Sequence, residues 1–92
     1  DIYALYQNYP NPFNPITTIK YDIPEDSFVE LIVYDLMGNV INNLVAQQES
    51  AGYKLIKWEG NNTNGHPASA GVYFYKIQTE TFIKTKKMIL LK

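Results

Sequence analysis

The sequence predicts an all-β protein, folded as an antiparallel β-sandwich of about seven strands. Three observations predict it. Short runs rich in β-branched and aromatic residues recur along the 92 residues, and Gly, Pro and Asn separate them. Several runs alternate apolar and polar residues, as half-buried strands do, and no window of helical length has a clean 3.6-residue period. Because the chain is too short for two cores, we expect one domain over residues 1–92.

The first half of the chain is expected to form four strands. Tyr3–Gln7 is an edge strand, and Thr17–Ile23 follows with clean alternation of apolar and polar residues. Phe28–Leu36 is the second strong strand, with every second residue directed inward. Val40–Val45 is weaker. A polar loop is expected over Gln47–Gly52, since its composition is typical of turns.

The second half is expected to form three more strands. Tyr53–Glu59 is followed by a long loop rich in Gly and Asn over residues 60–67. Gly71–Gln78 places three large apolar residues on one side, and Phe82–Leu91 closes the chain. This number of strands is that of an immunoglobulin-like sandwich.

A proline-rich segment lies between the first two strands. Its three prolines, within residues 10–15, leave the backbone few donors and hold the preceding residues out of the α region. A stiff, extended or turning segment is therefore expected, with Phe13 filling part of the core. The other residues expected in the core are Ile19, Tyr21, Val29, Leu31, Val33, Ile56, Trp58, Tyr73, Tyr75, Ile77, Met88 and Leu90.

The composition excludes several kinds of chemistry. A net charge of −1 argues against a nucleic-acid binder held mainly by charge. All basic residues are Lys, so no bidentate guanidinium clamp for phosphate is available. One His and no Cys exclude a His-rich metal site and a cysteine nucleophile. No nucleophile–base set is visible, so we expect a non-catalytic protein without a cofactor.

Charge is distributed unevenly along the chain. Residues 1–46 carry six acids and one Lys, a net charge of −5, whereas residues 47–92 carry three acids and seven Lys, a net charge of +4. Two interpretations are open: an interaction tail, or Lys alternating with apolar residues on a solvated strand face, which charge alone favours. The longest apolar run, Met88–Leu91, is far too short to span a membrane.

Four segments, in this order, resemble a known family. They are Gln7–Pro15 (QNYPNPFNP), Val33–Gly38 (VYDLMG), Gly71–Tyr75 (GVYFY) and Lys87–Lys92 (KMILLK). Together they resemble the type A C-terminal sorting domain of the type IX secretion system, which occurs in Bacteroidetes and related Gram-negative phyla. The chain is also similar to the immunoglobulin-like domain of the flagellar hook-capping protein. The resemblance covers nearly the whole chain.

The resemblance implies a function and a place in the cell. Such domains end large secreted enzymes and adhesins and are read by the outer-membrane translocon. Residues 1–92 are then expected to be the C-terminal sorting domain of a longer secreted protein. The implied route leads through the periplasm of a Gram-negative bacterium to the cell surface or the medium. The implied partners are the type IX translocon, its processing machinery and the upstream cargo, with no nucleic acid and no direct membrane span.

The resemblance also assigns roles to individual positions. The chain departs from the family at Asn39, where Lys or Arg is usual. The structural motif positions are Pro10, Asn11, Pro12, Phe13, Asn14, Pro15, Tyr34, Asp35 and Gly38. The sorting positions are Gly71, Tyr73, Lys87, Met88, Ile89, Leu90, Leu91 and Lys92.

Two interpretations of the last strand follow. It could be recognised as an extended peptide, by fraying or by adding to another sheet edge. The alternative is a closing strand that only completes the sandwich. Residue chemistry alone favours the closing strand, and the resemblance favours recognition.

A different class of function stays open beside the sorting domain. The chain could be a structural or carbohydrate-binding accessory module of a secreted polysaccharide-degrading enzyme, since aromatic rings can stack on sugars. The tyrosines that would serve are Tyr3, Tyr6, Tyr9 and Tyr53.

A weak calcium candidate lies in the long loop between the fifth and sixth expected strands. Glu59, Asn61 and Asn64 supply the oxygen atoms that calcium prefers. The loop has only one carboxylate and lacks the alternating acids of a strong calcium loop, so ordinary loop chemistry is the default.

Overall fold

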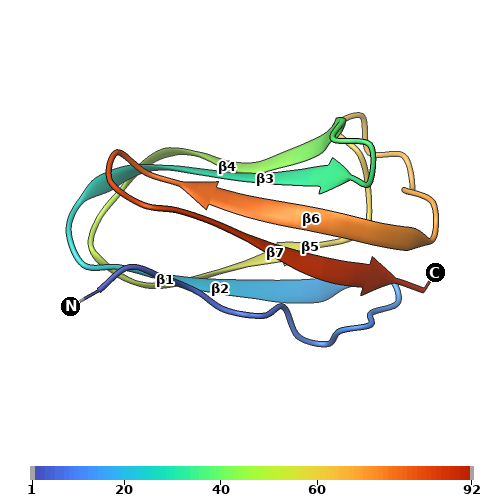
Figure 1. Cartoon of the computed structure of the whole chain (residues 1–92), viewed down its shortest axis with the longest axis horizontal. Helices are drawn as coiled ribbons and strands as arrows, with labels where there is room; N and C mark the ends of the chain where they lie inside the picture. The colour runs from blue at the N-terminus through green and yellow to red at the C-terminus, as the bar shows by residue number, and fades with distance from the viewer. Residues whose placement is uncertain (1, 92) are drawn as a thin grey trace.

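The computed structural model describes residues 2–91, which form two antiparallel sheets packed face to face (Figure 1). The three-stranded sheet has the order β1-β2-β5, and the four-stranded sheet has the order β4-β3-β6-β7. The expected immunoglobulin-like β-sandwich is confirmed. The strands are β1 (Ala4–Leu5), β2 (Thr17–Ile23), β3 (Ser27–Asp35), β4 (Val40–Glu49), β5 (Gly52–Trp58), β6 (Gly71–Gln78) and β7 (Ile83–Leu90).

The strand boundaries differ from the expected ones by one residue in β3, β5 and β7, and by more in two places. β1 has only two residues, although the chain after it still bonds to β2 through the Tyr6 amide and an isolated bridge between Tyr9 and Thr18. β4 runs to Glu49, where a loop was expected, and its last three residues pair with the start of β3. Polar residues suit this position because β4 is an edge strand: its backbone bonds to β3 while its side chains meet water. The hairpin to β5 shrinks to Ser50 and Ala51.

The core lies between the sheets and is built by alternation. In β2, β3 and β6 every second residue is buried, so their inward faces meet. Every expected core residue is buried except Ile56, which is only partly buried because β5 is an edge strand with β2 as its sole neighbour in the sheet. The core also contains Leu5, Ile23 and Val45, which the sequence analysis did not include.

Aromatic side chains close one end of the core. Trp58 is buried, and its ring centroid lies 5.7 Å from that of Phe13 and 5.5 Å from that of Tyr73. Its indole Nε1 donates to the carbonyl oxygen of Asn61 at 2.9 Å, so the polar edge of the ring is satisfied. Phe13 therefore does fill the core. Residues 2–91 contain no helix that could cross a membrane.

Candidate recognition site around the C-terminal strand

β7 is an edge strand, and its alternation divides the predicted sorting residues into two groups. Met88 and Leu90 point into the core and are buried. Lys87 and Ile89 point outward and are exposed. Leu91 follows the strand and is exposed, and Lys92 lies outside the described residues. Only the outward positions of the strand can meet a partner while the domain stays folded.

The two sorting positions on β6 are structural. Tyr73 is buried beside Trp58, and its hydroxyl donates to the carbonyl oxygen of Ser69; burial raises the pKa of this hydroxyl. Gly71 pairs with Leu90 and has a φ of +149°, a conformation that side chains rarely adopt. These residues hold the start of β6 in place, and the end of β7 pairs with this part of β6.

The residues that follow β1 cover the free edge of β7. Figure 1 shows the blue segment after β1 running toward the end of the molecule where β7 ends. The Phe13 amide donates to the Ile89 carbonyl at 3.0 Å, and the Leu91 amide donates to the Phe13 carbonyl at 2.8 Å. The Ile89 amide donates to Asn11 Oδ1 at 3.0 Å, and Gln7 Nε2 donates to the Lys87 carbonyl at 2.8 Å. We call residues 7–13 the clamp.

A buried polar network holds the start of the clamp. The Asn8 amide donates to the Tyr75 hydroxyl at 2.8 Å, and this hydroxyl donates to the Tyr6 carbonyl at 2.8 Å. Asn8 Nδ2 donates to Thr17 Oγ1 at 3.0 Å and to the Pro10 carbonyl at 3.2 Å. Asn8 is only 2% exposed, a burial that the sequence analysis did not predict. No local sequence pattern predicts that Asn8 is buried, because the hydroxyl that accepts from its amide belongs to Tyr75, 67 residues away in the sequence.

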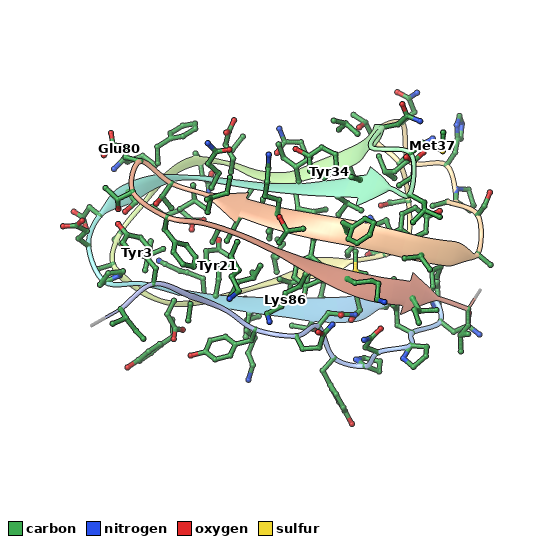
Figure 2. All side chains as sticks on the ribbon, in the orientation of Figure 1. Tyr3, Tyr21, Tyr34, Met37, Glu80 and Lys86 are labelled. Carbon is green, nitrogen blue, oxygen red and sulfur yellow. The ribbon has the colours of Figure 1, made fainter. Side chains whose placement is uncertain are left out.

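The clamp changes the expectation for the last strand. Along residues 87–91 the edge is already bonded, so an added strand could pair there only after the clamp was displaced. The first half of β7 is bordered instead by Lys84 and Lys86, and Figure 2 shows Lys86 on the side of β7 that faces the three-stranded sheet. Charged side chains of this kind protect an edge from non-specific pairing.

We expect Tyr75→Phe to lower the free energy of unfolding by about 1–3 kcal/mol, because the buried Asn8 amide loses its acceptor. Tyr21→Phe is the matched control, since its hydroxyl donates to Glu49 at the rim of the core, where water can replace it. Chemical denaturation followed by Trp58 fluorescence measures both variants. An equal, small loss in the two would show that the Asn8 network adds no stability.

The Tyr75 network also gives a pH dependence. Burial raises the pKa of Tyr75 to about 12, above the ordinary tyrosine value of 10.0. The stability that this tyrosine contributes is therefore complete below pH 10 and falls as the pH rises toward 12, because the unfolded chain releases the proton first. We expect the stability difference between wild type and Tyr75→Phe to shrink over this range, in denaturation curves measured at each pH.

The turn after β3 is built by one carboxylate. Asp35 Oδ1 accepts from the backbone amides of Met37 and Asn39, each at 2.9 Å, and Oδ2 accepts from Asn39 Nδ2 at 3.1 Å. These bonds, the one from the Asn39 backbone first, lower the pKa of Asp35. Gly38 has a φ of +89°, which favours glycine. Asn39 thus anchors the turn, at the position where the sorting-domain family that the sequence resembles usually has Lys or Arg.

Tyr34, next to this turn, belongs to the outer face of the four-stranded sheet. Figure 2 shows Tyr34 on β3, with Met37 in the turn beyond it. Tyr34 pairs across the strands with Phe74, and Phe74 pairs with Lys87. Lys76 Nζ lies 5.3 Å from the centroid of the Tyr34 ring, within the range of a cation–π contact. Three segments far apart in the sequence therefore meet on one surface.

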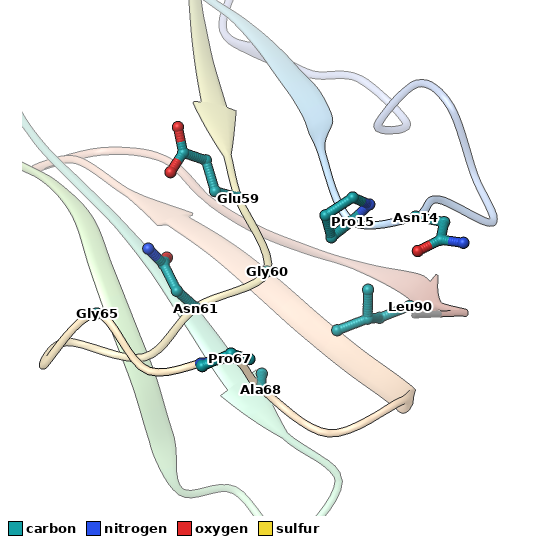
Figure 3. A pocket seen from close by; sticks show the side chains of 9 residues that line it. All are labelled: Asn14, Pro15, Glu59, Gly60, Asn61, Gly65, Pro67, Ala68 and Leu90. Carbon is teal, nitrogen blue, oxygen red and sulfur yellow. The ribbon is translucent and has the colours of Figure 1, made fainter.

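A pocket of about 440 Å³ lies beside the end of β7 (Figure 3). Pro15, Pro67 and Leu90 form apolar walls, while Glu59 and Asn61 supply oxygen atoms. Its residues are Asn14, Pro15, Glu59, Gly60, Asn61, Gly65, Pro67, Ala68 and Leu90.

Two features of this pocket bear on its chemistry. Gly60 has a φ of +68°, and a Cβ there would lie 2.9 Å from the Pro15 carbonyl, so the close approach requires glycine. Asn61 Oδ1 accepts from Asn42 Nδ2 at 3.2 Å, and Asn64 does not line the pocket. The three calcium candidates are therefore not brought together. Within residues 2–91, no group of three or more His, Cys, Asp or Glu could hold a metal ion.

The exposed tyrosines do not form a single row. Tyr3 stacks on Phe82 with ring centroids 5.2 Å apart, and Tyr9 is 80% exposed. Tyr6 and Tyr53, however, line one shallow hollow of about 450 Å³ on the outer face of the three-stranded sheet. The Tyr6 hydroxyl donates to Asp22 in this hollow, which raises the pKa of Tyr6. Lys20, Lys54 and Leu55 complete its lining.

Known proteins share this fold. The chain superimposes on part of dimeric latent PorU from Porphyromonas gingivalis with a TM-score of 0.78 and 22% sequence identity. The match covers 98% of this chain and 9% of PorU. For PorZ of the same species, described as an essential surface component of the type IX secretion system, the TM-score is 0.66 and the identity 18%, over 97% of this chain and 12% of that one. The chain thus spans a small part of either protein.

A flagellar protein is similar as well. FlgD from P. aeruginosa matches with a TM-score of 0.63 and 28% identity, over 80% of this chain and 58% of that one. A comparison with curated protein sequences finds no match. The family model described as the FlgD Ig-like domain matches residues 15–81, which is most of the sandwich from the end of the proline-rich segment to the turn before β7. By this match, the chain belongs to the FlgD Ig-like domain family.

Proposed function

We propose that this chain is a non-catalytic C-terminal sorting domain that directs an upstream cargo protein through the type IX secretion system to the cell surface or the medium. Support comes from the fold that it shares, over nearly its whole length, with parts of PorU and of PorZ, the latter described as a type IX component. The terminal strand supplies the observation that carries the proposal. Met88 and Leu90 bury it in the core, while Lys87 and Ile89 point outward opposite Phe74 and Val72 of β6.

A fusion tests this function directly. Residues 1–92 are attached to the C-terminus of a fluorescent protein that is directed to the periplasm of a host with a working type IX system. We expect fluorescence at the surface or in the medium, and we expect it to vanish in a translocon mutant. An intact, folded fusion that stays in the periplasm of the competent host would contradict the proposal.

A truncation of residues 87–92 is a weaker test than it first seems. It removes Met88 and Leu90 from the core together with the outward side chains. Loss of export would therefore report unfolding as readily as loss of recognition. Substitutions confined to outward positions separate the two effects.

The hollow between Tyr6 and Tyr53 favours a second candidate function, binding of a carbohydrate. Two tyrosine rings beside the Asp22 carboxylate offer a surface for stacking and an acceptor for sugar hydroxyls. Pull-down on insoluble cellulose, chitin and xylan tests it, with Tyr53→Ala as the matched variant, since this side chain is 91% exposed and its loss leaves the core intact. Retention of the wild type and not of the variant would support this function; release of both would exclude it for these glycans.

A further inference from the structure

We propose that the outer face of the four-stranded sheet is the surface through which the domain docks on a protein partner, one that presents apolar side chains flanked by carboxylates. The inference rests on the proposed sorting function and specifies its recognition surface. It places recognition on the folded sheet and not on a frayed terminal strand.

The outer face of this sheet is unusually apolar over β3, β6 and β7, whereas the edge strand β4 carries polar residues there. One face of an antiparallel sheet that meets water commonly carries polar residues. Here every outward position of β3 except Glu30 is apolar or aromatic, and β6 and β7 add further apolar positions. A contiguous apolar patch on a small protein marks an interaction site more often than an inert surface. The apolar outward residues are Phe28, Ile32, Tyr34, Val72, Phe74, Ile83 and Ile89.

The strand register makes this patch continuous at one end of the sheet. Tyr34 lies directly opposite Phe74, and Val72 lies directly opposite Ile89. Phe74 and Val72 are two residues apart on β6, so they neighbour each other on the same face. We call these four residues the aromatic face. Tyr34, Val72 and Phe74 are only partly buried, and Ile89 is 36% exposed, so all four can be reached from outside.

The charges that border the aromatic face are both positive. Lys76 and Lys87 border the aromatic face: Lys76 stands over the Tyr34 ring, and Lys87 lies opposite Phe74. Glu30 is the sole acid at the outward positions of β3, β6 and β7 within the described chain. It pairs with Gln78, four residue pairs along β3 and β6 from the pair formed by Tyr34 and Phe74. A partner with carboxylates around an apolar centre complements this pattern, and complementary charge of this kind speeds association and selects partners.

The other face of the sandwich is different and supplies controls. The outward positions of β2 are Thr18, Lys20 and Asp22, and β5 adds Lys57 opposite Thr18 and Leu55 opposite Lys20. Polar and charged residues of both signs alternate there with single apolar ones, as on an ordinary solvated sheet. Lys57 on this face and Lys84 on β7, opposite the buried Ile77, are exposed cations outside both the hollow and the outer face of the four-stranded sheet. They match Lys76 and Lys87 in residue type and secondary structure.

A charge reversal tests the proposal in the full-chain fusion to the periplasm-directed fluorescent protein. The test variant is Lys76→Glu with Lys87→Glu, and the matched control is Lys57→Glu with Lys84→Glu, which changes the net charge equally. We expect export to fall about tenfold in the test variant, since its charges now repel a carboxylate-bearing partner, and to stay at the wild-type level in the control. Thermal unfolding of both purified variants checks that each is folded.

A second pair of variants probes the apolar contact and covers the case in which charge reversal disturbs folding. Ile89→Ser removes a partly exposed apolar group from the aromatic face, and Ile16→Ser removes one at the residue that precedes β2 in the other sheet. Reduced export in the first and normal export in the second supports the proposal. If the wild type and every aromatic-face variant are exported normally, the outer face is not the docking surface. The proposed sorting function is not contradicted by that result. A wild-type fusion that is not exported overturns both.

Discussion

Trp58→Ala is expected to lower the free energy of unfolding by about 3–5 kcal/mol, the range for truncation of a large buried aromatic side chain. Trp58 is 1% exposed and packs against Phe13 from the clamp and Tyr73 from β6. Its removal leaves a cavity and also leaves the Asn61 carbonyl without its indole donor. Because small domains are stable by about 5–15 kcal/mol in total, this single change removes a large part of the margin.

The measurement is urea denaturation followed by circular dichroism, since the variant lacks the only tryptophan of the chain. Trp58→Phe is the control: it keeps an aromatic ring in the core but loses the indole donor, and we expect an intermediate loss. A denaturation midpoint that does not move in Trp58→Ala would show that the aromatic cluster is not part of the stabilising core.

Phe13→Ala is the second change with a large expected effect, again about 3–5 kcal/mol. Phe13 is 1% exposed, and its backbone bonds to Ile89 and Leu91, so its side chain holds the clamp on the edge of β7. Beyond the loss of stability we expect a local signature. The Leu91 amide, which donates to the Phe13 carbonyl, should lose its protection from hydrogen exchange.

Hydrogen exchange measured by NMR separates this local effect from global destabilisation. The control is Asn11→Ala, which removes the acceptor of the Ile89 amide and leaves the Phe13 anchor in place. We expect faster exchange at Ile89 alone in the control, and at both amides in Phe13→Ala. Unchanged protection of Leu91 in Phe13→Ala would mean that the clamp is held by its backbone bonds and by the Asn8 network without the phenylalanine.

The alternation of apolar and polar residues along the sequence predicted which side chains of the central strands face the core. Alternation in β2, β3 and β6 identified their inward residues, because a strand with one buried face must repeat every two residues. It failed where burial depends on sheet position. Ile56 alternates correctly but lies on an edge strand, and Gln47–Glu49 looked like a loop although backbone pairing with β3 makes it a strand.

The candidate site was only partly visible in the sequence. The resemblance marked Tyr34, Lys87 and Ile89, yet nothing local indicates that they share a face, because the pairing of β3 with β6 and of β6 with β7 brings them together. Alternation also cannot say whether an outward face is covered by another segment. The contact of the clamp with β7 could not be predicted from the sequence either. The prolines predicted a stiff segment, but the strand edge to which it bonds lies more than 70 residues further along the sequence.

The clamp also has a consequence for the order of events during synthesis. It joins residues 7–13 to residues 87–91, so the clamp cannot form its final bonds until residues 87–91 have been synthesised. Contacts of such long sequence separation form late and slowly in folding. Loss of residues 87–91 would remove the partner of the clamp together with the second half of β7. The aromatic face, with Ile89 set in register against Val72, is therefore complete only once this last strand of the sandwich has been synthesised.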